Sequence, residues 1–425
     1  MSTSDDGRFQ WFVGVDWAVA SHQVCVLDAQ GTLRGEYTVA HTLEALTAWV
    51  ARLRQLTEGA LPQVAVAIEV PRGAVVEFLL EQGASVFTLN PKQVDRFRDR
   101  YTVAGAKDDR RDARVLASAL RTDRPAFRPV AVDDPRIIQL RELSRMDDDL
   151  AAEQNRLLNR LREQVYRMAA PWLVLSPSAG DPWFWALLER VPSPAAAARS
   201  KRRVIDAILR SHRIRRVTTE EVLAVLHTPV IATAPGTVAA ATRHIAALLP
   251  RLRLVHDQRR GCAKEIDALL ASLADGDPPS AADSAANRPS DGAIVQSMPG
   301  IGRMVAATLW SEAATLLRLR HYAGLRALSG LAPVTRQSGG RRAVGMRHAC
   351  NAHLREACYH WARTSTVFEP GSKHYYATLR ARGHSHGRAL RSVADRLLRM
   401  LMAMLRTHTL FDPSRVRTSA EPVPA

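Results

Sequence analysis

Short apolar runs alternate with amphipathic segments along the N-terminal third of the chain. Runs such as QWFVGVD have the length and the spacing of buried strands, whereas TLEALTAWVARLRQLT repeats its apolar residues at helical intervals. Polar turns with Gly31 and Gly35 separate the first three runs. The pattern predicts strands at 10–16, 22–28, 33–39, 63–69 and 84–89, and helices at 42–57, at 73–82, from Pro91 and from Asp108.

The order of these elements is more informative than any one of them. Three successive strands followed by helix, strand, helix, strand and helix form the element order of an RNase H-like α/β domain, which we place at residues 8–130. In this order the first and fourth strands are commonly neighbours in the sheet. We therefore expect the residues that end these two strands to lie at one sheet edge.

Two long charged segments predict a helical hairpin or coiled coil in the middle of the chain. Apolar residues recur at three- and four-residue steps from 135 to 168, and a second long helix is predicted at 237–273, with a kink at Pro250. We assign 131–274 to this coiled-coil region, in which residues 170–235 form an insertion without a readable pattern.

The remainder of the chain divides by composition. Residues 275–293 are small, polar and rich in Pro, which indicates a flexible linker. Residues 294–413 predict a mainly α domain, apart from a Gly- and Arg-rich loop at 330–347. We expect residues 414–425 to be a disordered tail.

Positive charge is concentrated toward the C-terminus. The chain holds 59 Lys and Arg residues against 42 Asp and Glu, a net charge of +17, and only five of the basic residues are Lys. A GC-rich genome accounts for part of the preference for Arg, but not for the net charge. From Asp291 onward there are 20 basic and 7 acidic residues. The guanidinium group binds two phosphate oxygens at once, so the expected partner of this region is a polyanion.

Cysteine content and hydropathy exclude two classes of protein. The four Cys residues are irregularly spaced, which argues against a secreted disulfide scaffold and for a reducing cytosol. We find no early apolar run fit for a signal peptide and no apolar run long enough to cross a membrane. We therefore expect an intracellular protein without a membrane partner.

Four carboxylates fall at the ends of predicted elements. Asp16 ends the first strand and Glu69 the fourth, while Asp109 and Asp112 share one face of a predicted helix. Taken singly, each also fits a turn or a helix cap. Four converging carboxylates would repel one another unless a cation lay among them. Hard oxygen ligands favour Mg²⁺ or Mn²⁺, which can stabilise the attacking and leaving oxygens of a phosphodiester displacement.

Several motifs together resemble a known family. VGVDWA, the AVAIEV that contains Glu69, LNPKQVDRFRDRY and KDDRRDARVLA resemble the N-terminal domain of DEDD-type insertion-sequence transposases, a domain similar to the Holliday-junction resolvase RuvC. MPGIGRMVAATL, LSGLAPVTRQSGGRRAVGMRHACNAHLREACYHWA and YYATLRARGHSHGRALRSVADRLLRMLMAML resemble the family's C-terminal domain. The resemblance covers most of residues 10–168 and 294–413.

The resemblance implies roles for particular residues. Asp16, Glu69, Asp109 and Asp112 would be catalytic acids that bind Mg²⁺ (or Mn²⁺), and Ser338 would be a nucleophile toward DNA. Two departures concern the acids. The family usually has Thr after the Lys at position 107, where this chain has Asp108, and it favours a Thr-Gly pair after Glu69, where this chain has Val70-Pro71-Arg72-Gly73. The alignment with the family motif favours Asp109, rather than Asp108, as the third acid.

The loop around Ser338 combines a hydroxyl, glycines and cations. Gly339 and Gly340 allow the backbone to approach DNA, and Arg336, Arg341 and Arg342 can offset charge on a pentacoordinate phosphorus. Spacing alone favours a phosphate-contacting loop with an incidental Ser, and only the resemblance favours Ser338 as a nucleophile. Ser329 is a rival nucleophile. No His or Lys base lies beside Ser338 in the sequence. The resemblance implies that the base or the metal comes from the acidic domain, of this subunit or another.

A second nucleic-acid contact is predicted at Gly300, Gly302 and Arg303. The sequence MPGIG followed by a helix resembles half of a helix-hairpin-helix element, in which tight turns direct backbone amides at a phosphate without reading sequence. An ordinary turn at a helix start is the alternative.

These expectations combine into a transposase or recombinase that mobilises an insertion sequence. The resemblance implies a covalent phosphoserine link to DNA, a structured guide (bridge) RNA, homodimers or homotetramers, and a place at the nucleoid of a bacterial cytoplasm. The alternatives are a RuvC-like junction nuclease that uses metal-activated water, and an inactive nucleic-acid-binding regulator. Because the serine lacks a local base and the acids lack a nucleophile, we expect a composite active site.

Overall fold

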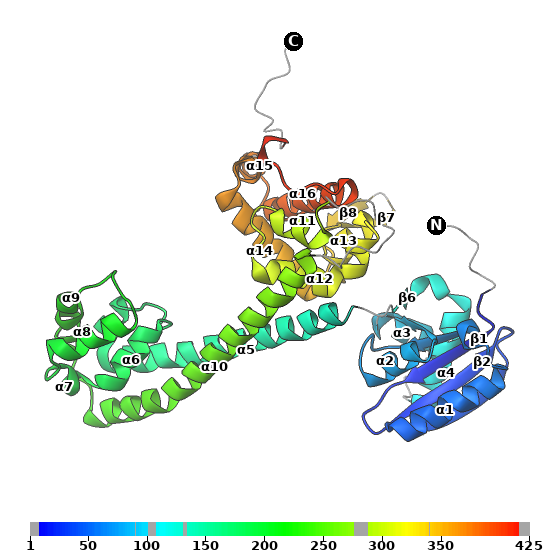
Figure 1. The fold of residues 1–425 in the computed structure, drawn as a ribbon, viewed down its shortest axis with the longest axis horizontal. Helices are drawn as coiled ribbons and strands as arrows, with labels where there is room; N and C mark the ends of the chain where they lie inside the picture. The colour runs from blue at the N-terminus through cyan, green and yellow to red at the C-terminus, as the bar shows by residue number, and fades with distance from the viewer. Residues whose placement is uncertain are drawn as a thin grey trace, which may run out of the picture. The chain divides into compact units, whose positions relative to one another are not determined.

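The computed structural model describes residues 8–89, 91–100, 108–130, 134–275, 288–339 and 341–415. The chain forms two compact units, Met1–Asp134 and Pro135–Ala425 (Figure 1). Each unit has hydrophobic cores of its own. Parts of the predicted linker and of the predicted tail, residues 276–287 and 416–425, lie outside the described residues.

Unit 1 is built on a six-stranded sheet with the order β3-β2-β1-β4-β5-β6. β1, β4 and β5 run parallel to one another, and the other three strands pair antiparallel with their neighbours. The strands are β1 (Trp11–Asp16), β2 (Ser21–Asp28), β3 (Leu33–Ala40), β4 (Val64–Ile68), β5 (Ser85–Thr88) and β6 (Arg128–Pro129). The first five lie where the sequence predicts them, whereas β6 is too short to leave a periodic signal.

Helices cover both faces of this sheet. Val13 and Val15 of β1 pack in one core with Trp49 of α1, whereas Phe12 packs in a second core with Leu116 of α4. Alternate residues of a strand face opposite sides, so one strand serves both cores. The helices are α1 (Leu43–Leu56), η1 (Leu61–Gln63), α2 (Ala74–Glu81), α3 (Pro91–Arg98), α4 (Asp109–Thr122) and η2 (Arg124–Ala126). The order and the topology confirm the predicted RNase H-like α/β fold.

Two long helices, α5 (Pro135–Ala169) and α10 (Pro235–Asp275), form an antiparallel pair in unit 2. Arg259 near the middle of α10 binds Asp147 of α5, and Arg136 at the start of α5 donates to the Ser272 carbonyl at the end of α10. The predicted helical hairpin is therefore present (Figure 1). α10 continues through Pro250 without a break in the helix.

The segment between the two long helices is a small helical cluster. It contains η3 (Ala170–Val174), α6 (Pro182–Arg190), α7 (Pro194–Ala197), α8 (Arg202–Ser211) and α9 (Thr219–Leu226). Trp172, Trp183 and Trp185 are buried in its core, together with residues from both long helices. These helices are short, which explains why the sequence shows no readable period there.

The C-terminal part of unit 2 surrounds a third helical core. Its helices are α11 (Asp291–Ser297), α12 (Arg303–Arg318), α13 (Tyr322–Leu328), α14 (Ala352–Phe368), α15 (Pro370–Ala381), α16 (His386–Thr407) and η4 (Pro413–Arg415). Ile137 and Leu140 of α5 and Ile266 and Leu270 of α10 belong to the same core. The start of α5 and the end of α10 thus pack in the core of the C-terminal part.

The prediction of a loop at 330–347 is wrong, because most of this segment is a β-hairpin. β7 (Val334–Ser338) pairs with β8 (Arg341–Gly345) in antiparallel register, with Ser338 opposite Arg341. Gly339 directly follows β7 with a φ of +54°, as a tight hairpin turn requires, whereas Gly340 lies outside the described residues. A Gly-Gly pair between two short strands was the available signal, and the high Arg and Gly content obscured it.

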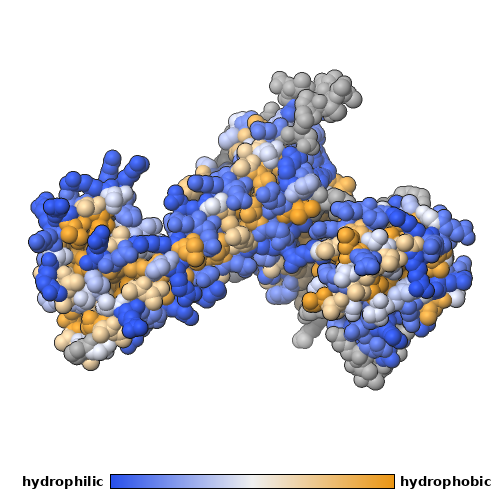
Figure 2. All heavy atoms as spheres, turned by 60° about the horizontal axis from the view of Figure 1, so that its bottom comes forward, coloured by the Kyte–Doolittle hydropathy of each residue, from blue (hydrophilic) through white to orange (hydrophobic). Residues whose placement is uncertain are grey.

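Among the described residues, no helix has both the length and the apolarity needed to span a bilayer. Figure 2 shows hydrophilic residues over much of the visible face, with apolar residues interspersed among them.

Candidate functional site

Asp16 and Glu69 follow neighbouring strands at the same edge of the sheet. β1 and β4 are parallel, and the last paired residues are Val15 and Ile68. Asp16 is the last residue of β1, and Glu69 comes directly after β4. Both side chains are half-buried. The structure therefore brings these two predicted acids together.

Gly14 brings α4 close to this sheet edge. A Cβ atom at Gly14 would lie 2.6 Å from the Ala117 amide nitrogen and closer still to the Ala113 carbonyl oxygen, both in the backbone of α4. Only glycine permits that approach. Asp112 directly precedes Ala113, so the contact fixes where this acid lies relative to β1. Gly14 is not among the residues predicted from the sequence, although a glycine inside a buried strand is a signal of close backbone approach.

Asp112 is buried and bound to Arg98 at the end of α3. Its side chain is only 3% exposed, and its two oxygens accept hydrogen bonds from Arg98 Nε at 2.7 Å and Nη2 at 2.9 Å. Arg98 Nη1 also donates to Asp95 at 2.8 Å. These hydrogen bonds to Asp112, with the charges of Asp112, Asp95 and Glu69, raise the pKa of Arg98. Nothing in the sequence indicates this cation among the acids, since Arg98 is one of many Arg residues.

Asp109 has different surroundings from Asp112, because it is exposed to solvent. It is the first residue of α4 and is exposed, while Asp108 is the N-cap and accepts a hydrogen bond from the Arg110 amide. Lys107 lies outside the described residues. The helix-cap role expected of an Asp here thus belongs to Asp108, whereas Asp109 lies in the first turn of α4, at the positive end of the helix dipole.

The four acids are not gathered around a single point. In the part of the chain that the structure describes, no three His, Cys, Asp or Glu side chains form a group that could hold a metal ion. Carboxylate oxygens nevertheless match the ligand preference of Mg²⁺ and Mn²⁺. A positive charge, the Arg98 guanidinium, already lies at Asp112 and within electrostatic reach of Glu69. The chemistry of these oxygen donors therefore suits a divalent cation, although the four acids do not surround a single point in this structure.

Ser338 lies at the tip of the β7–β8 hairpin and is exposed. Its hydroxyl makes no hydrogen bond to any described residue. Arg342, paired with Gln337, and Gly339 are also exposed. The side chains of Arg336 and Arg341 lie outside what the structure describes. By contrast, the rival Ser329 is fully buried and donates to the Leu325 carbonyl at 2.8 Å, so it cannot reach DNA without unfolding of its surroundings.

The base of the hairpin is anchored to the helical core. Arg347, just after β8, donates to the carbonyl of Ala332, just before β7. The Ala332 amide bonds to the Arg326 carbonyl at 2.9 Å, and the Asn351 amide bonds to the Leu328 carbonyl at 2.8 Å. Both ends of the hairpin are therefore fixed to α13, whereas its tip extends into solvent.

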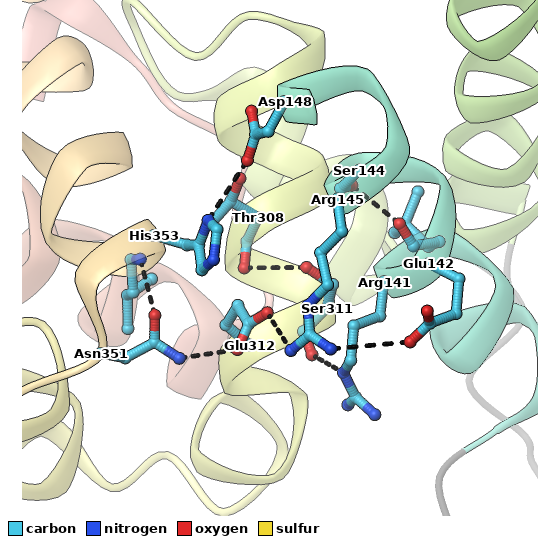
Figure 3. A network of polar contacts seen from close by, with 12 residues as sticks. Arg141, Glu142, Ser144, Arg145, Asp148, Thr308, Ser311, Glu312, Asn351 and His353 are labelled. Carbon is cyan, nitrogen blue, oxygen red and sulfur yellow. Dashed lines mark hydrogen bonds and ion pairs between the residues drawn. The ribbon is translucent and has the colours of Figure 1, made fainter. Parts of the chain in front are cut away.

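A polar network connects the segment at the base of the β7–β8 hairpin to α5 (Figure 3). Glu312 of α12, only 9% exposed, accepts from Asn351 Nδ2 at 2.6 Å with one oxygen and from Arg145 Nη2 at 3.0 Å with the other. Asn351 also caps α14 by accepting from the Leu354 amide. A second contact joins His353 to Asp148 of α5 at 3.2 Å. One carboxylate that is largely shielded from water thus holds α5, α12 and the start of α14 together.

Replacing Glu312 with Ala is expected to lower the free energy of unfolding of unit 2 by about 2 kcal/mol, because Arg145 and Asn351 each lose a charge-assisted hydrogen bond in a poorly solvated place. Chemical denaturation of the full chain measures the change. Glu356→Ala is the matched control, since its side chain is 75% exposed and should contribute less than about 0.5 kcal/mol. Equal effects of the two substitutions would contradict the structural role of Glu312.

The MPGIG segment forms a tight turn between α11 and α12. Gly300 has a φ of +76°, and a Cβ there would lie 2.8 Å from the Ser365 amide nitrogen of α14. The Pro299 carbonyl accepts from Trp361 and Ser365. Gly300 therefore serves the packing of the turn on α14. Gly302, by contrast, is exposed, and no atom of the described residues lies within 4 Å of its Cβ position. Arg303 is exposed and paired with Asp267.

A basic cavity of about 250 Å³ opens beside the start of α12. Arg259 is neutralised by Asp147, whereas Arg260 is exposed and forms no ion pair with the described residues. Guanidinium groups next to the amino end of a helix match the charge of a phosphate group. The cavity is lined by Asp147, Gln154, His256, Arg259, Arg260, Ala263, Arg303 and Met304.

Two family models of transposases match this chain, one near its N-terminus and one in its C-terminal third. A family model described as "Transposase" matches residues 13–169, and one described as "Transposase IS116/IS110/IS902 family" matches residues 292–377. The first match contains Asp16, Glu69, Asp109 and Asp112, and the second contains Ser338 and the MPGIG turn.

Individual relatives agree with these matches. The "Insertion element IS110 uncharacterized 43.6 kDa protein" of Streptomyces coelicolor is 31% identical over 80% of each chain. The "Mini-circle putative transposase for IS117" of the same species is 29% identical over 95% of this chain and 96% of that protein. "Putative transposase y4uE" of Sinorhizobium fredii is 51% identical, but over 48% of this chain and 57% of its own length. The chain belongs to the IS110 family of insertion-sequence transposases.

Proposed function

We propose that this transposase cuts and rejoins insertion-sequence DNA through a phosphoserine link at Ser338. The observation that carries the proposal is the placement of Ser338: an exposed hydroxyl at the tip of a hairpin whose base is fixed to the helical core. A rigid base with a projecting tip allows the serine to reach a phosphate in a DNA duplex. Gly339 keeps the tip narrow, and Arg336, Arg341 and Arg342 supply positive charge along the strands.

The proposed step is a substitution at phosphorus. Ser338 Oγ bonds to the phosphorus atom, the bond from phosphorus to one sugar oxygen breaks, and the serine proton passes to a base. The released sugar oxygen becomes a hydroxyl, and attack by a sugar hydroxyl on the phosphoserine rejoins the strand and frees Ser338. Positive charge near the hairpin stabilises the phosphorane, which carries more negative charge than the ground state.

The acids supply the second half of this site. Use of a divalent metal ion is implied by membership of the DEDD transposases. We propose Mg²⁺, or Mn²⁺, held by Asp16, Glu69, Asp109 and Asp112, which supplies charge stabilisation at the reacting phosphate when bound. Since Ser338 has no local base, we propose that the acids and the serine meet across nucleic acid, within a dimer or tetramer.

The transposase is expected to bind DNA through its basic C-terminal part, and we propose Gly302, Arg303 and the adjacent basic cavity as one phosphate contact. A structured guide RNA that bridges donor and target DNA is proposed from the family alone. We place this complex at the bacterial nucleoid, where its DNA substrate lies.

Mapping of a protein–DNA adduct tests the serine mechanism. The full chain is incubated with Mg²⁺, element ends and the transcript flanking the gene, then denatured and digested with trypsin. We expect a nucleotide mass on the peptide 337–341, because trypsin cuts after Arg336 and Arg341.

Cleaved DNA without an adduct, with ¹⁸O from labelled water in the product phosphate, would contradict the serine mechanism and favour a RuvC-like nuclease, which the pairing of Asp16 and Glu69 at one sheet edge also suits. Absence of both cleavage and adduct under these conditions would instead favour a regulator without chemistry.

A further inference from the structure

Arg98 engages both of the Asp112 oxygens that a metal ion would need as ligands. Its guanidinium binds both carboxylate oxygens of Asp112, at 2.7 Å and 2.9 Å, and its third nitrogen binds Asp95. The Asp112 side chain is 3% exposed and the Arg98 side chain 22% exposed, so water screens this pair only weakly. A carboxylate with both oxygens engaged in a bidentate pair has little capacity left for a metal ion.

We propose that Arg98 competes with the metal ion for Asp112. Arg98 must release Asp112 before that acid can serve as a metal ligand. The inference rests on the proposed metal site at the four acids. Arg98 stabilises the buried charge of Asp112 while no metal is bound. It thereby lowers the affinity of the four acids, Asp16, Glu69, Asp109 and Asp112, for a divalent ion. Arg98 also feels the charge of Glu69, so one side chain balances acids that come from α4 and from the end of β4.

The competition links metal binding to the position of α3. Arg98 is the last residue of α3, an eight-residue helix, and Asp112 lies near the start of α4. When Arg98 leaves Asp112, its planar fork becomes available for another anion, and phosphate has matching geometry. Asp112 therefore exchanges the Arg98 guanidinium for a metal ion.

Titration of the full chain with Mn²⁺, followed by electron paramagnetic resonance of the free ion, tests this proposal. In Arg98→Met the site should bind Mn²⁺ about tenfold more tightly than in the wild type, because the bidentate competitor is gone. Arg98→Lys keeps the charge but loses the fork, and should lie between the two. Arg96→Met is the matched control: Arg96 is an exposed residue of the same helix, and its loss should leave the dissociation constant unchanged.

Asp112→Asn separates this proposal from the proposed metal site. If Asp112→Asn loses Mn²⁺ binding while Arg98→Met and Arg98→Lys bind no more tightly than the wild type, the competition is refuted and the metal site stands. If Asp112→Asn binds Mn²⁺ as the wild type does, Asp112 is not a ligand, which refutes both the competition and the place of Asp112 in the proposed metal site. The Lys variant keeps the test decisive if the Met variant does not fold.

Discussion

Replacing Ser338 with Ala is expected to remove the covalent DNA adduct entirely and to lower strand exchange by at least about 1,000-fold. The substitution deletes the attacking oxygen and changes little else, because the Ser338 side chain is exposed and forms no hydrogen bond with the described residues. The free energy of unfolding should therefore remain within about 0.5 kcal/mol of the wild type. Strand exchange between two labelled DNA duplexes, with Mg²⁺ and the flanking transcript, provides the measurement.

Ser329→Ala is the control for this experiment. Ser329 is the other serine of the same region, but it is buried and bonded to the Leu325 carbonyl. Its replacement should retain the adduct, with a loss of stability of about 1 kcal/mol. Full cleavage by Ser338→Ala would refute the serine mechanism and support attack by water. Loss of the adduct in Ser329→Ala at unchanged stability would reopen the choice of nucleophile.

Replacing Gly14 with Ala is expected to destabilise unit 1 by about 3 kcal/mol or more. The new methyl group would meet the backbone of α4, 2.6 Å from the Ala117 nitrogen and 2.9 Å from the Ala113 carbonyl carbon. Helix backbone cannot move aside as a flexible side chain can, so α4 must shift away from β1. Hydrogen–deuterium exchange across β1 and α4 of the full chain, together with chemical denaturation, measures the effect.

A glycine in unit 2 supplies the matching control. Gly261 lies inside α10, and a Cβ added to it would meet no atom of the described residues within 4 Å. Gly261→Ala should stabilise its helix by about 0.5–1 kcal/mol, because alanine loses less backbone freedom on folding. If Gly14→Ala left the exchange of β1 and α4 unchanged, the close contact of these elements would be wrong.

The sequence by itself determined the elements and the family of this protein. Strand-length apolar runs predicted β1 to β5, and helical spacing predicted α5 and α10, because burial on one or both faces forces these periods on any such segment. The same order placed Asp16 and Glu69 at one sheet edge, since the parallel pairing of β1 with β4 follows from the fold. Charge counts indicated a polyanion partner for the C-terminal third.

Only the tertiary structure decided what surrounds each of these residues. Arg98 and Asp112 are 14 positions apart in the chain, and no periodicity predicts that one neutralises the other. Glu312, Arg145 and Asn351 meet from three separate segments, and Ser329 differs from Ser338 in burial, which no local pattern revealed. Local pattern records how often a segment faces the core, but contacts between distant segments depend on how the faces pack. The competition at Asp112 and the anchored serine hairpin are properties of that packing.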